Sequence, residues 1–203
     1  RSLPMTRVRA ALRRQDFVDA AVEVIAAHGV AGATTRRIAE AASCPLASLH
    51  YVFHTKDDLF DAVYESLFDL LAANALADRE FHSFGELAGW QLRKNAEWLV
   101  QHPSYARAQS ELIQWAERHR PDFALKTYVE TIERTIAYLG KCAPQVNRDA
   151  IESVARMSII LIDGLLNSWQ GDTNIRELRA NLDSASSALE AFATSLSSST
   201  VQA

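Results

Sequence analysis

Hydrophobic positions recur with helical spacing from near the start of the chain. The first apolar stripe consists of Phe17, Ala20, Ala21, Val24 and Ile25. Apolar residues three and four positions apart form one face of a helix, and Gly29 is placed to take the left-handed conformation that ends it. The pattern therefore predicts a first helix over residues 11–28.

Two shorter helices are predicted next. Thr34 or Thr35 can cap a short helix whose buried stripe includes Ile38. Pro45 then interrupts the period, and it suits the first turn of a third helix that ends near Val52. Two short helices joined by a tight turn are typical of a helix-turn-helix.

Helical spacing continues over the rest of the chain. Thr55 with Asp58, and Ser83 with Glu86, have the spacing of capping boxes, which mark helix starts. The further helices are predicted over residues 55–78, 83–101, 104–118, 121–140, 147–170 and 173–196. With only 7 Gly and 5 Pro in the chain, few residues break these helices, so we expect an all-α fold.

Composition adds bounds on the class of protein. Of the 203 residues, 48% are hydrophobic and 23% are charged, values that exclude a disordered or fibrous chain. The most apolar run, residues 159–166, is too short to span a bilayer and is broken by Asp163. The first residues contain no leader-like stretch and Met5 is a candidate start, so we expect a cytoplasmic protein without membrane contact.

The charge is distributed unevenly along the chain. Residues 1–56 hold eight Lys or Arg against four acids, a net charge of +4, whereas the remainder has a net charge of −8. A basic segment on an acidic body suits a nucleic-acid contact at one end, although solvated charges placed by chance give the same sum.

A spaced set of residues between Arg14 and Leu59 matches a known family. The set consists of Gly29, Ala33-Thr34-Thr35, Ile38-Ala39, Ala42, residues 48–53, Lys56 and Asp58-Leu59. Through these residues the chain resembles the DNA-binding domain of TetR-family transcriptional regulators. The resemblance implies an N-terminal three-helix helix-turn-helix DNA-binding domain over residues 1–55. A C-terminal helical ligand-binding and dimerisation domain would then cover residues 56–203.

Two positions depart from the pattern of this family. Ser43 stands at the turn position that is commonly Gly, so a serine must adopt the turn at a cost of about 1 kcal/mol. His50 stands where the family commonly has a Tyr that touches the DNA backbone. An imidazole keeps a phosphate contact, and its protonation would make DNA affinity rise as the pH falls.

The resemblance assigns DNA contacts to both short helices and to the start of the next one. The predicted residues are Thr35, Arg36, Arg37, Leu46, Ala47, Ser48, His50, Tyr51 and Lys56. The first turn of the recognition helix faces bases, while Lys56 and the amides that open the next helix share a phosphate. The alternative is that the Arg and Lys residues are solvated surface charges. Arg7, Arg9, Arg13 and Arg14 form either a minor-groove arm or an unstructured tail.

The sequence of residues 56–203 predicts an effector site and a dimer interface. Its aromatic-rich helices also carry polar residues such as Gln91 and Asn95, which suit an apolar or aromatic effector. In most helical domains, however, such aromatic rings are ordinary core residues. The candidate ligand-binding residues are Trp90, Trp98, Tyr105, Tyr128 and Asn167. The last two helices, residues 147–170 and 174–196, are expected to form a homodimer interface that includes Leu182 and Leu189.

No pattern of a catalytic or metal site emerges. Nucleophile elbows, zinc-binding helices and phosphate-binding loops are absent, and His50 and His54 do not share one short helix. Cys44 and Cys142 lie far apart without ligand spacing. The sequence therefore predicts a homodimeric repressor without cofactor, released from a palindromic double-stranded DNA operator by a small-molecule effector. The alternative is an all-α enzyme that acts on a small apolar molecule.

Overall fold

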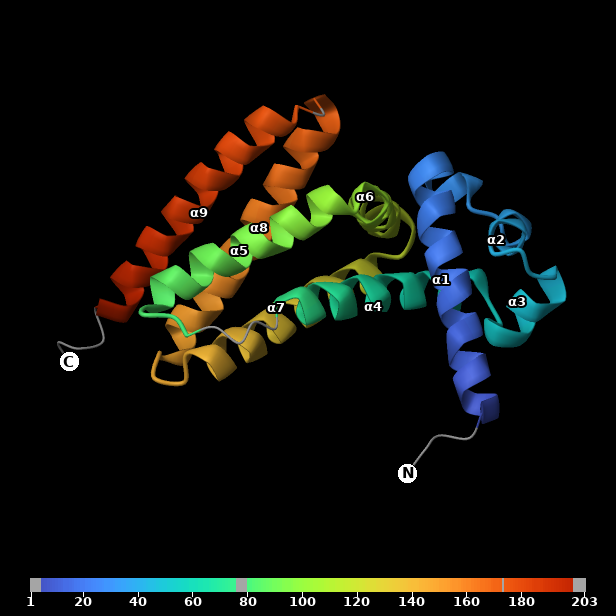
Figure 1. Cartoon of the computed structure of the whole chain (residues 1–203), viewed down its shortest axis with the longest axis horizontal. Coiled ribbons are helices and arrows are strands. Elements are labelled where there is room, and N and C mark those ends of the chain that lie inside the picture. Colours follow the sequence, from blue (N-terminus) through green and yellow to red (C-terminus); the bar gives the residue numbers. More distant parts are fainter. Residues whose placement is uncertain (1–4, 76–79, 173, 199–203) are drawn as a thin grey trace. The chain divides into compact units, whose positions relative to one another are not determined.

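Helices alone form the regular structure of the residues that the computed structural model describes, 5–75, 80–172 and 174–198 (Figure 1). Their bounds are α1 Met5–Gly32, α2 Thr35–Ala41, α3 Leu46–Val52, α4 Lys56–Ala75, α5 Phe84–Gln101, α6 Pro103–His119, α7 Pro121–Cys142, α8 Arg148–Asp172 and α9 Ile175–Ser198. The all-α expectation is confirmed, and each predicted helix is present among the described residues. The predicted helix end at residue 78 and the predicted helix start at residue 173 lie outside those residues, and the other ends are shifted by a few positions.

The largest shift concerns the start of α1, which begins at Met5 rather than near residue 11. The basic residues at positions 7, 9, 13 and 14 therefore lie on a helix, and the expected unstructured tail is wrong for them. At its other end α1 is interrupted at Gly29, where φ is 66° and ψ is 172°. Side chains rarely adopt this conformation, so glycine is required there.

By their packing, the first residues up to Leu70 and residues 102–120 form one unit, here called the head. Its core contains Phe17, Ile25, Ile38, Leu49, Phe60, Ala108 and Leu112. The last two belong to α6, which packs along α1. These packing units are defined by contacts alone and do not test the functional boundary between residues 55 and 56, which remains a prediction.

The second packing unit, here called the body, contains residues 71–101 and those from Pro121 onward. Its core contains Leu87, Leu92, Leu99, Leu139, Leu178 and Leu189. Helix α5 approaches α9 closely: a Cβ added at Gly85 would lie 2.6 Å from the carbonyl oxygen of Glu190. One turn on, a Cβ added at Gly89 would lie 3.0 Å from the carbonyl oxygen of Ser186, so both glycines allow the contact.

Two leucines of α9 do not lie where the sequence analysis placed them. Leu182 and Leu189 are 4% and 1% exposed within a single protomer. Both fill the core of the body, where α9 packs against α5 and α8. The expectation that they face a partner subunit is therefore wrong, because the apolar side of α9 that carries both leucines is buried in the core of the same protomer.

The chain passes between head and body at three places: within α4, between α5 and α6, and between α6 and α7. Helix α6 is thus a head element whose two ends continue directly into body helices. In the described part of the chain, no helix has the length and apolar character needed to cross a membrane.

Candidate nucleic-acid interface and effector site

The turn between α2 and α3 contains a serine in a left-handed conformation. The φ angle of Ser43 is 52°, the only positive value for a non-glycine residue in the described chain. The Ser43 amide donates to the carbonyl of Glu40 at 3.0 Å, and the Cys44 amide donates to Ala39 at 2.9 Å. The expectation that Ser43 takes the glycine-like turn is confirmed, and the hydrogen bonds hold it there.

Helix α3 is anchored by a single buried side chain, that of Leu49. The other side of the helix carries Leu46, Ala47, His50 and Tyr51, all exposed. Tyr51 is 85% exposed, whereas an aromatic side chain that packs within its own protomer is mostly buried. This helix therefore presents an outward face of apolar and hydrogen-bonding groups, with Ser48 half-buried beside it.

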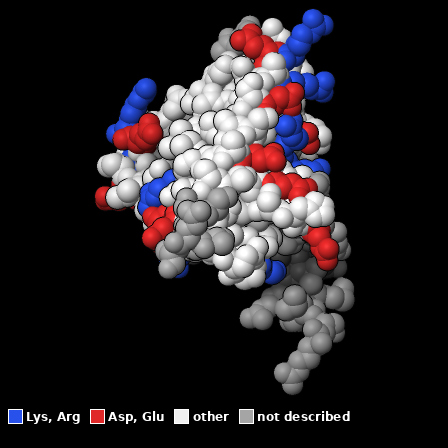
Figure 2. Space-filling view, turned by 90° about the vertical axis from the view of Figure 1, so that its left-hand side faces the viewer, with Lys and Arg blue, Asp and Glu red and all other residues white. Residues whose placement is uncertain are grey.

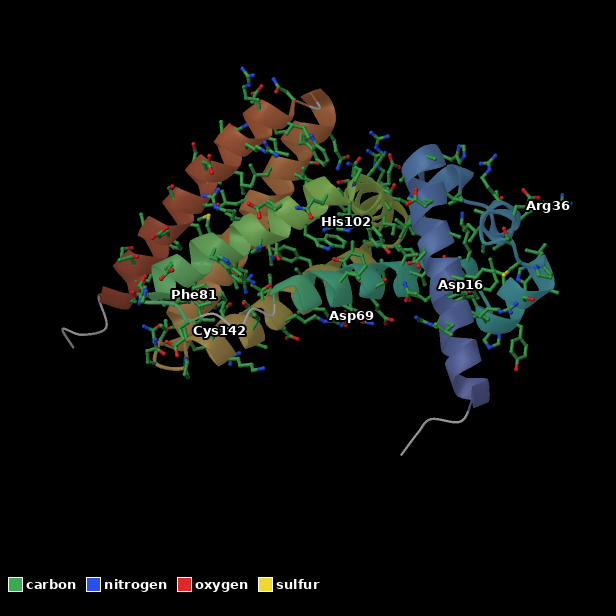
Figure 3. All side chains as sticks on the ribbon, viewed as in Figure 1. Asp16, Arg36, Asp69, Phe81, His102 and Cys142 are labelled. Atoms are coloured by element: carbon green, nitrogen blue, oxygen red, sulfur yellow. The ribbon has the colours of Figure 1, made fainter. Side chains whose placement is uncertain are left out.

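The two arginines of α2 have different surroundings. Arg36 projects from α2 toward solvent (Figure 3), and its guanidinium lies 3.7 Å from Glu40 in an exposed ion pair. Such a pair is worth less than about 1 kcal/mol, so Arg36 can exchange Glu40 for a phosphate. Arg37 instead donates through Nη1 to the carbonyl of Gly32 at 2.7 Å.

The start of α2 is fixed by the residues around these arginines. The Arg37 amide donates to Thr34 Oγ1 at 3.2 Å, so Thr34 is the capping residue of the predicted pair. Thr35 is half-buried as the first residue of the helix. The side chain of Arg37 thus closes the turn before α2 and has a structural partner of its own.

Lys56 begins α4 in partly buried surroundings. Its ammonium donates to the carbonyl of Val30 at 3.2 Å and lies 4.9 Å from the centre of the Phe60 ring. Burial lowers the pKa of Lys56, and the neighbouring charge of Asp57 opposes this shift. An ammonium has three donors, so one bond to Val30 leaves donors for a further acceptor.

A capping box precedes Lys56, as the sequence predicts. The Thr55 amide donates to Asp58 Oδ2 at 2.9 Å, and the Asp58 amide donates to Thr55 Oγ1 at 3.0 Å. The bond from the Thr55 amide is the main cause that lowers the pKa of Asp58. These two bonds fix the first turn of α4, and the bond from Lys56 to the Val30 carbonyl holds that turn beside the end of α1.

The predicted effector residues do not lie in one packing unit. Trp90 and Trp98 are half-buried on α5, where the Trp90 ring lies 5.2 Å from that of Phe81. Tyr128 on α7 and Asn167 on α8 are exposed. Tyr105 belongs to the head.

The hydroxyl of Tyr105 donates to Asp19 of α1 at 3.0 Å. Burial, followed by the charge of Asp19, raises the pKa of Tyr105 to about 12. Beside it, Ser104 Oγ donates to Glu23 at 2.9 Å. These bonds join α6 to α1 and give Tyr105 a role within the head.

Two amides on α5 stand out that the sequence analysis noted only as polar residues. The side-chain oxygens Gln91 Oε1 and Asn95 Oδ1 are buried and have no hydrogen-bond partner among the described residues. The sequence offers one sign that the two amides act together, which is their spacing of four positions on an aromatic-rich helix. Burial without a partner is visible only in the structure.

Helices α8 and α9 each keep an exposed face outside the body core. On α8 this face includes Met157, Ile160, which is 58% exposed, and Gly164, where an added Cβ would meet nothing within 4 Å. On α9 it consists mainly of the small residues Ala180, Ser184, Ser187, Ala188, Ala191 and Ser195. Figure 2 shows a side of the molecule on which much of the described surface carries no charged group.

Among the described residues, no group of three or more His, Cys, Asp or Glu side chains is arranged to hold a metal ion.

Comparisons with known proteins agree with this geometry. Residues 17–63 match the family model described as bacterial regulatory proteins, tetR family. The HTH-type nicotine-responsive transcriptional repressor HdnoR of Paenarthrobacter nicotinovorans is 30% identical over 174 residues, which cover 78% of this chain and 84% of that protein. The chain therefore belongs to the TetR family of transcriptional regulators, which are DNA-binding proteins rather than enzymes, and the enzyme alternative is set aside.

Solved structures share the fold of this chain. A crystal structure of the multidrug binding protein EbrR complexed with imidazole is 28% identical, covers 85% of this chain and 92% of that chain, and has a TM-score of 0.59. A transcriptional regulator from Rhodococcus sp. Rha1 is 17% identical over 87% of this chain and 95% of that chain, with a TM-score of 0.72. The latter shows the shared fold alone.

Proposed function

We propose that this protein is a homodimeric repressor whose head binds a palindromic operator and whose body binds a small aromatic effector that releases the DNA. The observation that carries the proposal is the outward face of α3, where Tyr51 and Leu46 are exposed while Leu49 anchors the helix. A regulator acting on chromosomal DNA works in the cytoplasm.

The residues of the head divide the DNA contacts between bases and phosphates. The first turn of α3, with Leu46, Ala47 and Ser48, enters the major groove, where apolar groups contact thymine methyls and Ser48 can hydrogen-bond. His50, Tyr51 and Arg36 surround it with donors for phosphates. Thr35 and Arg37 lie beside these donors at the start of α2, where Arg37 keeps its bond to the Gly32 carbonyl.

Lys56 completes the phosphate contacts. Its ammonium keeps the bond to Val30 and uses a remaining donor, while the amides that open α4 supply further donors to the same anion. Partial burial removes water from the ammonium, which strengthens its attraction to a phosphate at close range.

Dimerisation doubles this interface. A single short recognition helix gives little affinity, whereas two heads related by a two-fold axis read two half-sites. The exposed faces of α8 and α9 suit a four-helix interface between two protomers, because small residues on α9 and the open space at Gly164 permit close approach.

The names of the relatives support the proposed class of effector. HdnoR is named nicotine-responsive, and EbrR was solved with imidazole, proflavin and malachite green. All four molecules combine an aromatic system with nitrogen, and the aromatic-rich helix α5 suits such a ligand. An effector releases the operator only to the extent that it binds the free protein more tightly than the DNA-bound one.

The test uses a duplex selected by the purified protein from a random pool, with nicotine as the first effector. Nicotine is expected to quench tryptophan fluorescence and to weaken operator binding over the same concentration range, by about 5- to 150-fold at saturation. Operator DNA must weaken nicotine binding by the same factor. Ligand binding without any change in operator affinity would contradict the sensor function, and failure to select any duplex would contradict the DNA-binding function.

A further inference from the structure

Two neighbouring side-chain oxygens on α5 are buried without a hydrogen-bond partner among the described residues. Gln91 is only 5% exposed, and its Oε1 has no partner among the described residues. Asn95, one turn further along α5, is half-buried, and its Oδ1 is equally without a partner there. Buried polar atoms are normally paired, so a pair of neighbouring exceptions calls for an explanation.

The two amides lie on the side of α5 that faces away from α9. Contacts to α9 are made through Gly85, Gly89 and Arg93, the last of which pairs with Asp183. At 100° per residue, Gln91 and Asn95 point to the opposite side of the helix. Trp98 follows at i+7 from Gln91, so an indole ring and two amide oxygens share one face of α5.

These groups select a ligand by its chemistry. An amide oxygen accepts hydrogen bonds and cannot donate, so its complement is an N–H or O–H group. The neighbouring indole offers a flat apolar surface that suits an aromatic ring.

We propose that Gln91 and Asn95 recognise N–H donors on an aromatic effector whose ring packs against Trp98. This inference rests on the proposed effector function and specifies the class of ligand: an aromatic ring with N–H donors rather than a counterpart in which N-alkyl groups replace those hydrogens. In the complex, the ligand donates to both oxygens, which have no partner among the described residues of the ligand-free protein. Pairing these buried oxygens would therefore contribute to the stabilisation that the ligand gives.

The first experiment compares proflavin with acridine orange by fluorescence titration without DNA. Both dyes share a cationic acridine skeleton, but the exocyclic N–H groups of proflavin are replaced by N-methyl groups in acridine orange. The wild-type protein is expected to bind proflavin about tenfold more tightly or better.

The variants Gln91→Leu and Asn95→Leu isolate the hydrogen bonds from the size of the dye. Each is expected to reduce the preference for proflavin several-fold, since leucine fills the space but cannot accept. Gln101→Leu, an exposed glutamine on the same helix, is the matched control and should keep the wild-type preference. The comparison of preferences cancels steric differences between the dyes, as in a double-mutant cycle.

A stability measurement supplies an independent readout. In the ligand-free protein, Gln91→Leu removes an unpaired buried acceptor, so its thermal midpoint should equal or exceed that of the wild type. Saturating proflavin should raise the midpoint of the variant less than that of the wild type. If Gln91→Leu fails to fold, Asn95→Leu, at a half-buried position, carries the same test.

Several outcomes would overturn the inference: no binding of proflavin, equal affinity of the wild type for both dyes, or an unchanged preference in both leucine variants. If the preference is unchanged while nicotine still releases the operator, the amide inference fails and the proposed function stands. If the variants lose the preference but no ligand affects operator binding, the amide site stands and the repressor mechanism fails.

Discussion

At the scale of single residues, the fold of the head depends on two positions at which the backbone conformation limits which residue can be present. Gly29 and Ser43 both have positive φ angles, but only the first is a glycine. An L-residue in the left-handed region is less stable than glycine there, and the bonds from the Ser43 and Cys44 amides hold the turn against this cost.

The first prediction concerns this serine. Replacing Ser43 by Gly relieves the left-handed strain but adds freedom to the unfolded chain, so the free energy of unfolding should rise by about 0.5–1 kcal/mol. Ser43→Ala retains the Cβ atom and should give no such gain. Thermal unfolding of the three proteins measures the effect, and a similar shift in both variants would show that the turn carries no strain of this kind.

The second prediction concerns Lys56. Each phosphate contact contributes a slope of about −0.9 to the dependence of log K on log salt, so Lys56→Ala should flatten the slope by about 1.8 per dimer. Operator binding measured over a range of salt concentrations tests this. Lys126→Ala removes the same charge from an exposed site in the body and should keep the wild-type slope. An unchanged slope in Lys56→Ala would exclude Lys56 from the phosphate contacts.

At the scale of elements, sequence pattern located the helices because their signals are local. The capping box of Thr55 and Asp58 and the one that begins α5 were both predicted from a spacing of three residues. The placement of α6 in the head was not predictable in this way. It depends on contacts such as Tyr105 to Asp19, which join residues 86 positions apart.

A second long-range contact fixes the far end of α6. Arg120 donates through Nη1 to Asp61 at 3.0 Å, and its Nε lies 3.6 Å from Asp57. Both acids belong to the first turns of α4, which follow directly on the proposed phosphate contact at Lys56. Because α6 continues into body helices at both ends, we predict that this group of ion pairs contributes to the coupling between effector binding and DNA binding.

The third prediction tests that coupling. Arg120→Ala should lower the free energy of unfolding by about 1–2 kcal/mol, because a partly buried guanidinium with two acidic partners is lost. It should also reduce the factor by which the effector weakens operator binding. Denaturant unfolding and operator titrations with and without nicotine measure both effects.

Arg118→Ala, at an exposed position of the same helix, should leave both quantities unchanged. Arg120→Lys should recover only part of the coupling, because an ammonium cannot bridge two carboxylates as a planar guanidinium does. If the effector weakens operator binding of Arg120→Ala by the wild-type factor, the contacts of Arg120 with α4 play no part in the release of DNA.

At the scale of the whole molecule, the limit of sequence analysis lies in assigning apolar surface to its partner. The stripes of α8 and α9 predicted an interface, yet Leu182 and Leu189 face the protomer's own core. Periodicity shows that a helix has an apolar side but not which neighbour covers it. The same limit applies to the effector site, where Tyr105 proved to be a head residue and the unpaired amides of α5 emerged only with burial.

The fourth prediction separates core from interface on these helices. Ile160 is 58% exposed in the protomer, so Ile160→Glu should leave a single chain folded but place a charge in the proposed dimer interface. An uncompensated buried charge costs several kcal/mol, which is enough to dissociate many dimers. Sedimentation should therefore give twice 22.5 kDa for the wild type and 22.5 kDa for the variant, with unchanged helical circular dichroism.

Two control variants accompany Ile160→Glu. Leu125→Glu places the same charge at an exposed leucine of α7 and should remain dimeric, because that residue lies outside the proposed interface. Leu189→Glu should instead unfold the body, since its side chain lies in the core. Monomeric Ile160→Glu should also lose most operator affinity, because a single head reads only one half-site. A dimeric Ile160→Glu variant at micromolar concentration would show that the subunits meet elsewhere than at this face of α8.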